Sequence, residues 1–299
     1  MISQVIPLFF VIFLGAFAWL VGFKEEQFSK NLNTFVFYFA LPCFIFHELS
    51  SVHSGTAFPW GYFVAFGLSS FATIGLSFLV LPKATNESEK WLRSFASVHS
   101  NAGYLGIPFS LAVFNTSLPA IVVIIFQVLI LTPLQLAILS YDRATKGNLL
   151  LVLFKNPILV SAILGAACGF IGIAVPKVVD DSLNFVGRSA MPLALFSLGL
   201  FMGEQLKTIL NFRKTVATVV ILKNFIHPLV AYLIGKYLIN IDPAMLPSIV
   251  VMASMPTAVN NLIFSREYQA FEKDSGAVIV YTTLVFMVLS FIFALAFKI

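Results

Sequence analysis

Charged side chains are scarce in this chain. Of its 299 residues only 10% are Asp, Glu, Lys or Arg, whereas 59% are hydrophobic, and the mean hydropathy is +0.96. Soluble globular domains carry about 25% charged residues. The composition therefore excludes a soluble protein and indicates a polytopic membrane protein that has the lipid bilayer as a partner.

Cysteines and catalytic motifs are scarce as well. The two cysteines, Cys43 and Cys168, lie in apolar runs, where we expect packing roles. No G-x-S-x-G motif, intramembrane aspartate pair or nucleotide-binding loop is present, and HELSSVH has Ser51 where a zinc-protease motif needs histidine. We therefore predict that the protein is not an enzyme, has no cofactor and does not pump with ATP; metal binding is left open.

Apolar runs long enough to cross a bilayer recur along the whole chain. A transmembrane helix needs about 20 mostly apolar residues, and we predict ten of them with short connections. They are 3–23, 31–49, 58–81, 93–114, 118–140, 157–174, 183–203, 215–237, 246–264 and 276–297. The longest polar connection, YDRATKGN from Tyr141, falls at the midpoint.

The basic residues predict the orientation of these spans. If the N-terminus is outside, thirteen of the 18 Lys and Arg residues lie on inside connections, and Lys223 lies within a span. The remaining four lie outside, namely Lys177, Arg188, Lys236 and Lys298. Because cytoplasmic loops carry such an excess, both termini are predicted outside the cell membrane. This distribution also accounts for the net charge of +5, so we predict that the protein does not bind nucleic acid.

The two halves of the chain carry matching helix breakers. Pro42 lies in the second span and Pro192 in the seventh, and we interpret both as kinks or hinges. NAGYLGIPFS in the fourth span matches MPTAVNNLIFS in the ninth. Because five is odd, the second half must cross the membrane in the opposite sense. The predicted fold class is all-α, with ten transmembrane helices in two inverted five-helix repeats.

Spans four and nine are predicted to be broken. Pro108 removes a backbone donor, while Gly103 and Gly106 permit unusual dihedral angles. Irregular backbone at membrane depth survives only inside protein or facing water, and half-helix N-termini attract anions. We therefore predict a substrate site where the breaks meet, although packed kinks are the alternative. Its residues are Asn101, Gly103, Tyr104, Gly106, Pro108, Pro256, Asn260 and Asn261.

Lys223 is the charged residue predicted to lie deepest in a span. It is nine residues into the eighth span, and His227 follows four residues later on the same helix face. A charge at that depth indicates a functional role, so Lys223, His227 and His99 are candidates for coupling or charge tuning. The alternatives are that Lys223 extends to the cytoplasmic interface and that His99 only packs.

Three stretches resemble the auxin efflux carrier family: NAGYLGIPF, MPLALFSLGLFMG and MPTAVNNLIFSREY. The resemblance covers essentially the whole chain and implies an architecture similar to bile acid:sodium symporters. Asn101, Pro108, Pro256 and Asn260 would then lie at the crossover of spans 4 and 9. PIN-type carriers with a long central loop have a large cytoplasmic domain where this chain has only residues 141–156. This difference is typical of a short, bacterial member and argues against auxin as the substrate.

The same resemblance implies two moving parts. Residues 1–50 and 157–206 would form a scaffold, and residues 58–140 and 213–299 a transport domain that moves like an elevator, in a homodimer. We predict a secondary transporter of small organic anions, namely carboxylates that are auxin-like or dicarboxylates, in the inner cell membrane, with H⁺ and Na⁺ left open as coupling ions. The alternatives are a sodium-coupled organic-anion importer and, from a different class, an anion channel.

Overall fold

The chain folds into an all-helical protein. The computed structural model describes residues 2–51, 58–140, 155–209 and 213–296, and no strand occurs within these ranges. The connection that starts at Tyr141 lies outside these ranges. So do the last three residues of the predicted second part of the transport domain, 213–299. In the first half of the chain the helices are α1 (Ile2–Leu20), α2 (Glu26–Phe35), α3 (Leu41–Ser50), α4 (Trp60–Val80), α5 (Glu87–Ala96), α6 (Ile107–Phe114), α7 (Leu118–Phe126) and α8 (Thr132–Leu139).

The described residues of the second half of the chain are also helical. Its helices are α10 (Pro157–Ile171), α11 (Lys177–Gly187), α12 (Ala190–Ile209), α13 (Lys214–Ile221), α14 (His227–Leu233), α15 (Leu246–Ser254), α16 (Asn260–Glu267) and α17 (Glu272–Ala296), with a 3-10 turn at Pro243–Met245. Five π-helical segments extend or join these helices: Val36–Ala40, Ala102–Gly106, Gln127–Leu131, Leu222–Ile226 and Ile234–Leu238.

Six helices in the described ranges are long and apolar enough to cross a membrane. They are Gln27–Ser50, Trp60–Val80, Leu118–Leu139, Lys177–Leu206, Lys214–Leu238 and Glu272–Phe293. Four shorter apolar helices are Gln4–Leu20, Ala102–Phe114, Pro157–Gly169 and Pro243–Ser254. Each predicted span overlaps one of these ten helices. The six long helices agree with a polytopic membrane protein, while ten crossings in two inverted repeats stay a prediction.

Four of the π-helical segments accommodate a proline. The residue before Pro42, Pro108, Pro133 or Pro228 donates its backbone N–H to the carbonyl oxygen five residues earlier. Proline lacks an N–H and its ring clashes with the preceding turn, and a widened turn relieves both problems without ending the helix. Pro192 differs from these four, because it lies in the first turn of α12, directly after the chain leaves α11.

The break in the fourth predicted span lies earlier than the sequence predicted. Residues 97–101 are irregular, whereas Ala102–Phe114 is a continuous helix that contains both glycines and Pro108. Gly106 is helical, with φ −65° and ψ −44°. The expectation that Gly103, Gly106 and Pro108 unwind the backbone is therefore wrong. The π-helical segment absorbs the proline, and neither glycine has a positive φ.

Close backbone contacts hold α1 against α12. A Cβ atom on Gly15 would clash with the carbonyl oxygen of Phe196, and one on Gly199 would clash with the carbonyl oxygen of Ile12. Gly165 on α10 and Gly187 at the end of α11 approach the backbone of α3 in the same way. Small residues at helix interfaces allow such approach in membrane proteins. The contacts join helices from the two halves of the chain.

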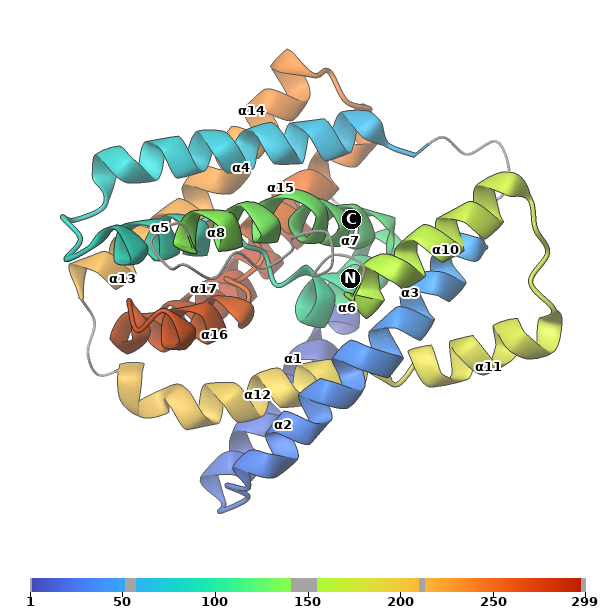
Figure 1. Ribbon diagram of the computed structural model, residues 1–299, viewed down its shortest axis with the longest axis horizontal. Helices are drawn as coiled ribbons and strands as arrows, with labels where there is room; N and C mark the ends of the chain where they lie inside the picture. Colours follow the sequence, from blue (N-terminus) through green and yellow to red (C-terminus); the bar gives the residue numbers. More distant parts are fainter. Residues whose placement is uncertain (1, 52–57, 141–154, 210–212, 297–299) are drawn as a thin grey trace.

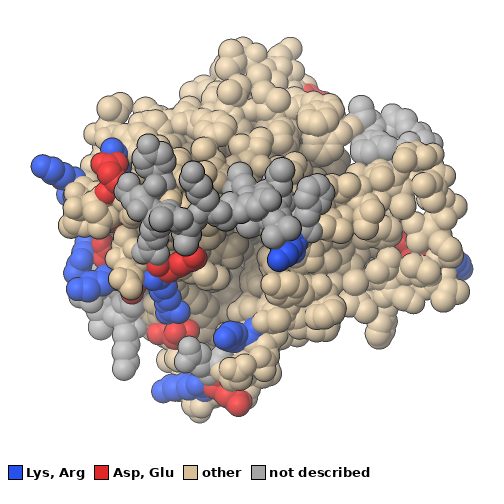
Figure 2. All heavy atoms as spheres, in the orientation of Figure 1, with Lys and Arg blue, Asp and Glu red and all other residues tan. Residues whose placement is uncertain are grey.

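The helices form two groups in space. In Figure 1, α3, α10 and α11 lie together at the right, with α12 and α2 below, while α4, α5, α13, α16 and α17 lie at the left. Figure 2 shows that most charged side chains visible on this face lie at its left and lower edges. Many large apolar side chains are exposed, including Phe10, Phe13 and Phe17 on α1 and Val178 and Phe185 on α11. Such a surface suits lipid rather than water.

The α1–α12 contact yields a first test. Gly199→Ala places a methyl group on the Ile12 carbonyl, and we expect a loss of about 1–3 kcal/mol in the free energy of unfolding. Gly75→Ala on α4 is the matched control, because no atom lies within 4 Å of its added Cβ. There the better helix propensity of alanine should leave stability unchanged or raised by up to about 1 kcal/mol. Unfolding in detergent measures both, and equal stability of the two variants would contradict the packing described here.

Candidate functional site

The two irregular segments lie against each other in the protein interior. Residues 97–101 follow α5, and residues 255–259 separate α15 from α16. The Asn101 N–H donates to the Pro256 carbonyl oxygen at 2.8 Å, and the Ala258 N–H donates to the His99 carbonyl oxygen at 3.1 Å. Ser100 lies opposite Thr257 in an antiparallel bridge. The paired segments thus use some of the backbone groups that the breaks free.

Local sequence explains one of the two breaks. Met255 precedes Pro256 and has an extended conformation, with φ −50° and ψ 147°. The proline ring disfavours a helical conformation in the preceding residue, so α15 ends at Ser254. The first break has no such signal, since no proline or glycine occurs in residues 97–101. Its conformation rests on contacts with the second segment.

Two hydroxyl groups cap the opposite helices reciprocally. Ser100 Oγ donates to the carbonyl oxygen of Met252 in the last turn of α15, at 2.8 Å. Thr257 Oγ1 donates to the carbonyl oxygen of Ala96 at the end of α5, also at 2.8 Å. The last four carbonyl groups of a helix have no partner within the helix, and buried ones need one. Each broken segment therefore supplies a cap for the helix that leads into the other.

Lys223 reaches the same place from η4, the π-helical segment Leu222–Ile226. Its side chain is fully buried, and Nζ donates to the carbonyl oxygens of Ala253 at 2.7 Å and Val98 at 3.3 Å, and to Ser100 Oγ at 2.8 Å. It therefore does not extend to the interface, which was the alternative from the sequence. No carboxylate in the described ranges forms an ion pair with it.

Its two histidine neighbours are also buried. His227 Nδ1 lies 3.4 Å from Lys223 Nζ, and its Nε2 faces Ser69 Oγ at 3.4 Å and Ser70 Oγ at 3.3 Å. His99 lies in the first break, and its Nε2 is 3.4 Å from Thr132 Oγ1. The structure thus brings Lys223 and His227 into contact, as their spacing predicted.

Side-chain amides occupy the start of each helix that follows a break. Asn101 precedes Ala102, and its buried Nδ2 has no acceptor within hydrogen-bonding distance among the described residues. Asn261 is buried in the first turn of α16, and its Nδ2 likewise lacks an acceptor there. Asn260, the other predicted amide, is exposed. Two buried donors without partners suit a ligand that supplies acceptor atoms, such as an oxyanion, while Gln135 Oε1 and Asn224 Oδ1 are buried acceptors without a donor among the described residues.

The remaining predicted residues lie around this centre. Gly103 and Tyr104 are half-buried in the first turn after the break, while Gly106 and Pro108 are buried further along the same helix. Pro256 shapes the second break and contributes its carbonyl oxygen. The described residues contain no group of three or more His, Cys, Asp or Glu that could hold a metal ion.

Sequence reasoning missed three polar residues at the site. Thr257 directly follows the proline of the second break, and Asn224 follows Lys223. Asn224 Nδ2 donates to the carbonyl oxygens of Ser254 at 3.0 Å and Thr282 at 3.2 Å. Gln135 Nε2 donates to Asn261 Oδ1 at 3.5 Å. Polar side chains within apolar spans were the available signal, because such residues usually face the interior of a helix bundle.

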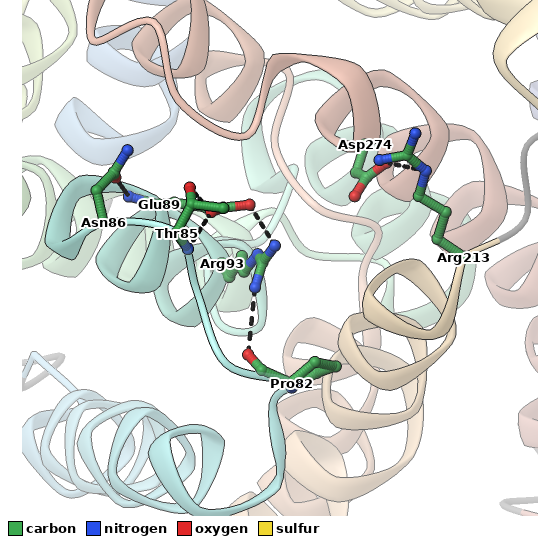
Figure 3. Close-up of polar contacts among 7 residues, drawn as sticks. All are labelled: Pro82, Thr85, Asn86, Glu89, Arg93, Arg213 and Asp274. Atoms are coloured by element: carbon green, nitrogen blue, oxygen red, sulfur yellow. Dashed lines mark hydrogen bonds and ion pairs between the residues drawn. The ribbon is translucent and has the colours of Figure 1, made fainter.

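A second polar cluster fixes the start of α5 (Figure 3). Asn86 Oδ1 accepts the Glu89 backbone N–H at 2.7 Å, and the Glu89 carboxylate accepts the Thr85 N–H at 2.7 Å and pairs with Arg93. Arg93 also donates to the Pro82 carbonyl oxygen at 3.2 Å. Burial raises the pKa of Glu89, but the hydrogen bonds from Thr85 and the charge of Arg93 outweigh it, so this pKa lies below its usual value.

The cluster continues on neighbouring helices. Arg213, at the start of α13, pairs with Asp274 in the first turn of α17 at 3.6 Å. The guanidinium carbon of Arg93 lies 5.8 Å from the centre of the Phe271 ring. The ion pair joins the starts of α13 and α17, and the Arg93–Phe271 contact joins α5 to the residue before α17. Arg93 lies in the last turn of α5, so its contact with Phe271 anchors this helix close to the break.

Comparison with known protein families agrees with a membrane carrier. The model of a family described as "Membrane transport protein" matches residues 1–294. A Rhizobium meliloti protein named "Putative malonate transporter" is 25% identical over 296 residues, covering 94% of this chain and 90% of its own length. Auxin efflux carrier component 5 of Arabidopsis thaliana is 24% identical over 313 residues, covering 89% and 88%. An "Uncharacterized transporter" of Methanocaldococcus jannaschii is 26% identical over 270 residues, covering 87% and 86%.

The reciprocal caps can be tested by removing one hydroxyl. Thr257→Val keeps the shape of the side chain but leaves the Ala96 carbonyl without its donor, and we expect a loss of about 1–3 kcal/mol in unfolding free energy. Thr218→Val on α13 removes a hydroxyl that only donates to the Lys214 carbonyl within its own helix. This control should change stability by less than about 0.5 kcal/mol. The interpretation would be wrong if both variants unfolded at the same temperature in detergent.

Proposed function

Since the chain belongs to the membrane transport protein family, which includes the auxin efflux carriers, we propose that it is a secondary transporter of small organic anions. Carboxylates of the size of malonate are the first candidates, because a relative that covers nearly the whole chain carries that name. The proposed site lies at the crossing of the two broken helices. It is proposed to bind the anion through side-chain amides and through the helix N-termini that follow each break.

One observation carries the choice of an anion. Asn101 Nδ2 and Asn261 Nδ2 are buried donors without acceptors among the described residues. A buried polar group without a partner is costly, so a ligand that supplies acceptors gains affinity at this place. The partial positive charge of a helix N-terminus adds to the attraction. The Lys223 amino group contacts the same paired segments, at the carbonyl oxygens of Val98 and Ala253 and at Ser100 Oγ.

We propose an elevator mechanism with two bodies. Residues 1–50 and 157–206 would stay in place as a scaffold, which is supported by the close α1–α12 and α3–α10 backbone contacts. Residues 58–140 and 213–299 would carry the site, supported by the hydrogen bonds that join the two breaks. We further propose both termini outside the inner cell membrane and a homodimer, following the basic residues and the family.

Uptake by purified protein in liposomes tests the proposed function. A panel of radiolabelled mono- and dicarboxylates, including malonate and indole-3-acetate, is offered with imposed proton or sodium gradients. We expect saturable uptake of at least one acid, and exchange against the same acid inside. Inward transport that requires sodium would instead indicate a sodium-coupled importer. Ion current without saturation would indicate an anion channel, and no transport of any acid would reject the proposal.

The amide donors provide the matching variants. Asn101→Ala and Asn261→Ala each remove a buried donor, which should cost about 1–3 kcal/mol of binding energy and lower the affinity for the transported acid roughly tenfold or more. Asn260→Ala is the comparison within the same helix turn, and its effect should be smaller because this side chain is exposed. Initial uptake rates over a range of substrate concentrations measure all three. Unchanged affinity in both buried-site variants would remove the crossing as the binding site.

A further inference from the structure

The surroundings of the Lys223 ammonium group are those of a cation site. Three oxygen atoms face Nζ: the Ala253 carbonyl at 2.7 Å, Ser100 Oγ at 2.8 Å and the Val98 carbonyl at 3.3 Å. An ammonium group has three N–H donors, and it can direct them to these oxygens, with His227 Nδ1 as a fourth, longer contact at 3.4 Å. Ser100 accepts this bond while its own hydroxyl hydrogen goes to Met252. The arrangement therefore needs no further donor or acceptor.

The oxygens come from both broken helices. The Val98 carbonyl lies just beyond α5, and Ala253 lies in the last turn of α15. Helix C-termini carry partial negative charge, and two of them meet here. In carriers with broken helices, unwound carbonyl groups and half-helix C-termini are the groups that coordinate a dissolved Na⁺ or H⁺. In this chain a side chain from a third helix already occupies such a position.

The charge has no other compensation in the described structure. Lys223 is fully buried, and no carboxylate there pairs with it. Its basic neighbours are His227, whose Nδ1 lies 3.4 Å away, and His99 in the first break, and neither can neutralise a cation. Burying an unpaired charge is expensive unless polar groups surround it. The carbonyl and hydroxyl oxygens at the crossing are therefore what holds the ammonium group there, and it in turn holds the two breaks together.

We propose that the Lys223 ammonium group is a tethered substitute for a coupling cation. The oxygens of Val98, Ser100 and Ala253 form a monovalent-cation site that the chain fills itself. The broken helices are consequently complete without a dissolved ion, and transport by the natural protein does not require Na⁺. Removing the side chain vacates the site and makes the protein dependent on a small cation from solution. This inference rests on the proposed transport function only in the experiments that measure uptake, and not in those that measure thermal stability.

The test compares variants that differ in space and charge. Lys223→Ala removes the charge and leaves room for an ion, whereas Lys223→Met removes the charge and fills the space. The purified proteins are heated in detergent with sodium, potassium, methylammonium or choline chloride at equal ionic strength. We expect the melting temperature of the Ala variant to rise in sodium, potassium or methylammonium relative to choline, because a ligand bound only by the folded state stabilises it. The Met variant and the natural protein should show no such difference.

Uptake gives the second readout. The natural protein should take up the transported acid at the same rate in sodium and in choline. The Ala variant should lose activity in choline and regain at least part of it with a small cation, while the Met variant should stay inactive in every salt. If the Ala variant does not fold, the natural protein still decides the question, since a sodium requirement for its uptake or its stability would overturn the proposal.

The outcomes separate this inference from the proposed function. An Ala variant that gains neither stability nor uptake from any cation overturns the tethered-cation site while carboxylate transport by the natural protein stands. A cation-dependent melting temperature in the Ala variant, combined with no uptake of any acid by the natural protein, supports the site and rejects the transport proposal. Full activity of the Met variant would show that no cation is needed at the crossing.

Discussion

A helix that ends inside a membrane protein leaves carbonyl groups that water cannot reach, and the organisation of this molecule follows from that constraint. Both α5 and α15 end in the interior. Each free backbone carbonyl there costs several kcal/mol in a hydrocarbon environment unless a donor is found. The chain supplies donors from the opposite break and from a third helix. The two breaks consequently stabilise each other, and the first, which has no local signal, depends on the second for its conformation.

This dependence also explains the limits of prediction from the sequence. The second break was placed correctly because Pro256 restricts its own neighbour, which is a local effect. The first was placed too far along the chain, since the glycines and Pro108 are conspicuous but belong to a helix with a π-helical segment. Nothing local ends α5 at Ala96. Its end is set by hydrogen bonds to residues about 150 positions away in the sequence, and no pattern of breakers contains that information.

The polar residues divide in a similar way. Composition and apolar runs were sufficient to predict a polytopic membrane protein, and the signature stretches were sufficient for the family. The depth of Lys223 in its span indicated an unusual residue, but the sequence left open whether it reached outward or inward. That choice depends on which helices surround it. Asn260 and Asn261 are adjacent in sequence and equally polar, yet one is exposed and the other buried. Only the packing of α16 distinguishes them.

The π-helical segments have a consequence for the faces of their helices. A π-helical segment between two α-helical stretches amounts to one residue added to a regular helix, and an α-helix turns by about 100° per residue. Side chains beyond the insertion are therefore out of phase with those before it. The helix that carries Lys223 contains one such segment in its interior, Leu222–Ile226, which lies between α13 and α14. The polar residues at its two ends can therefore face the same protein interior, although they lie on different faces of a regular helix. The apolar residues of both ends then face lipid.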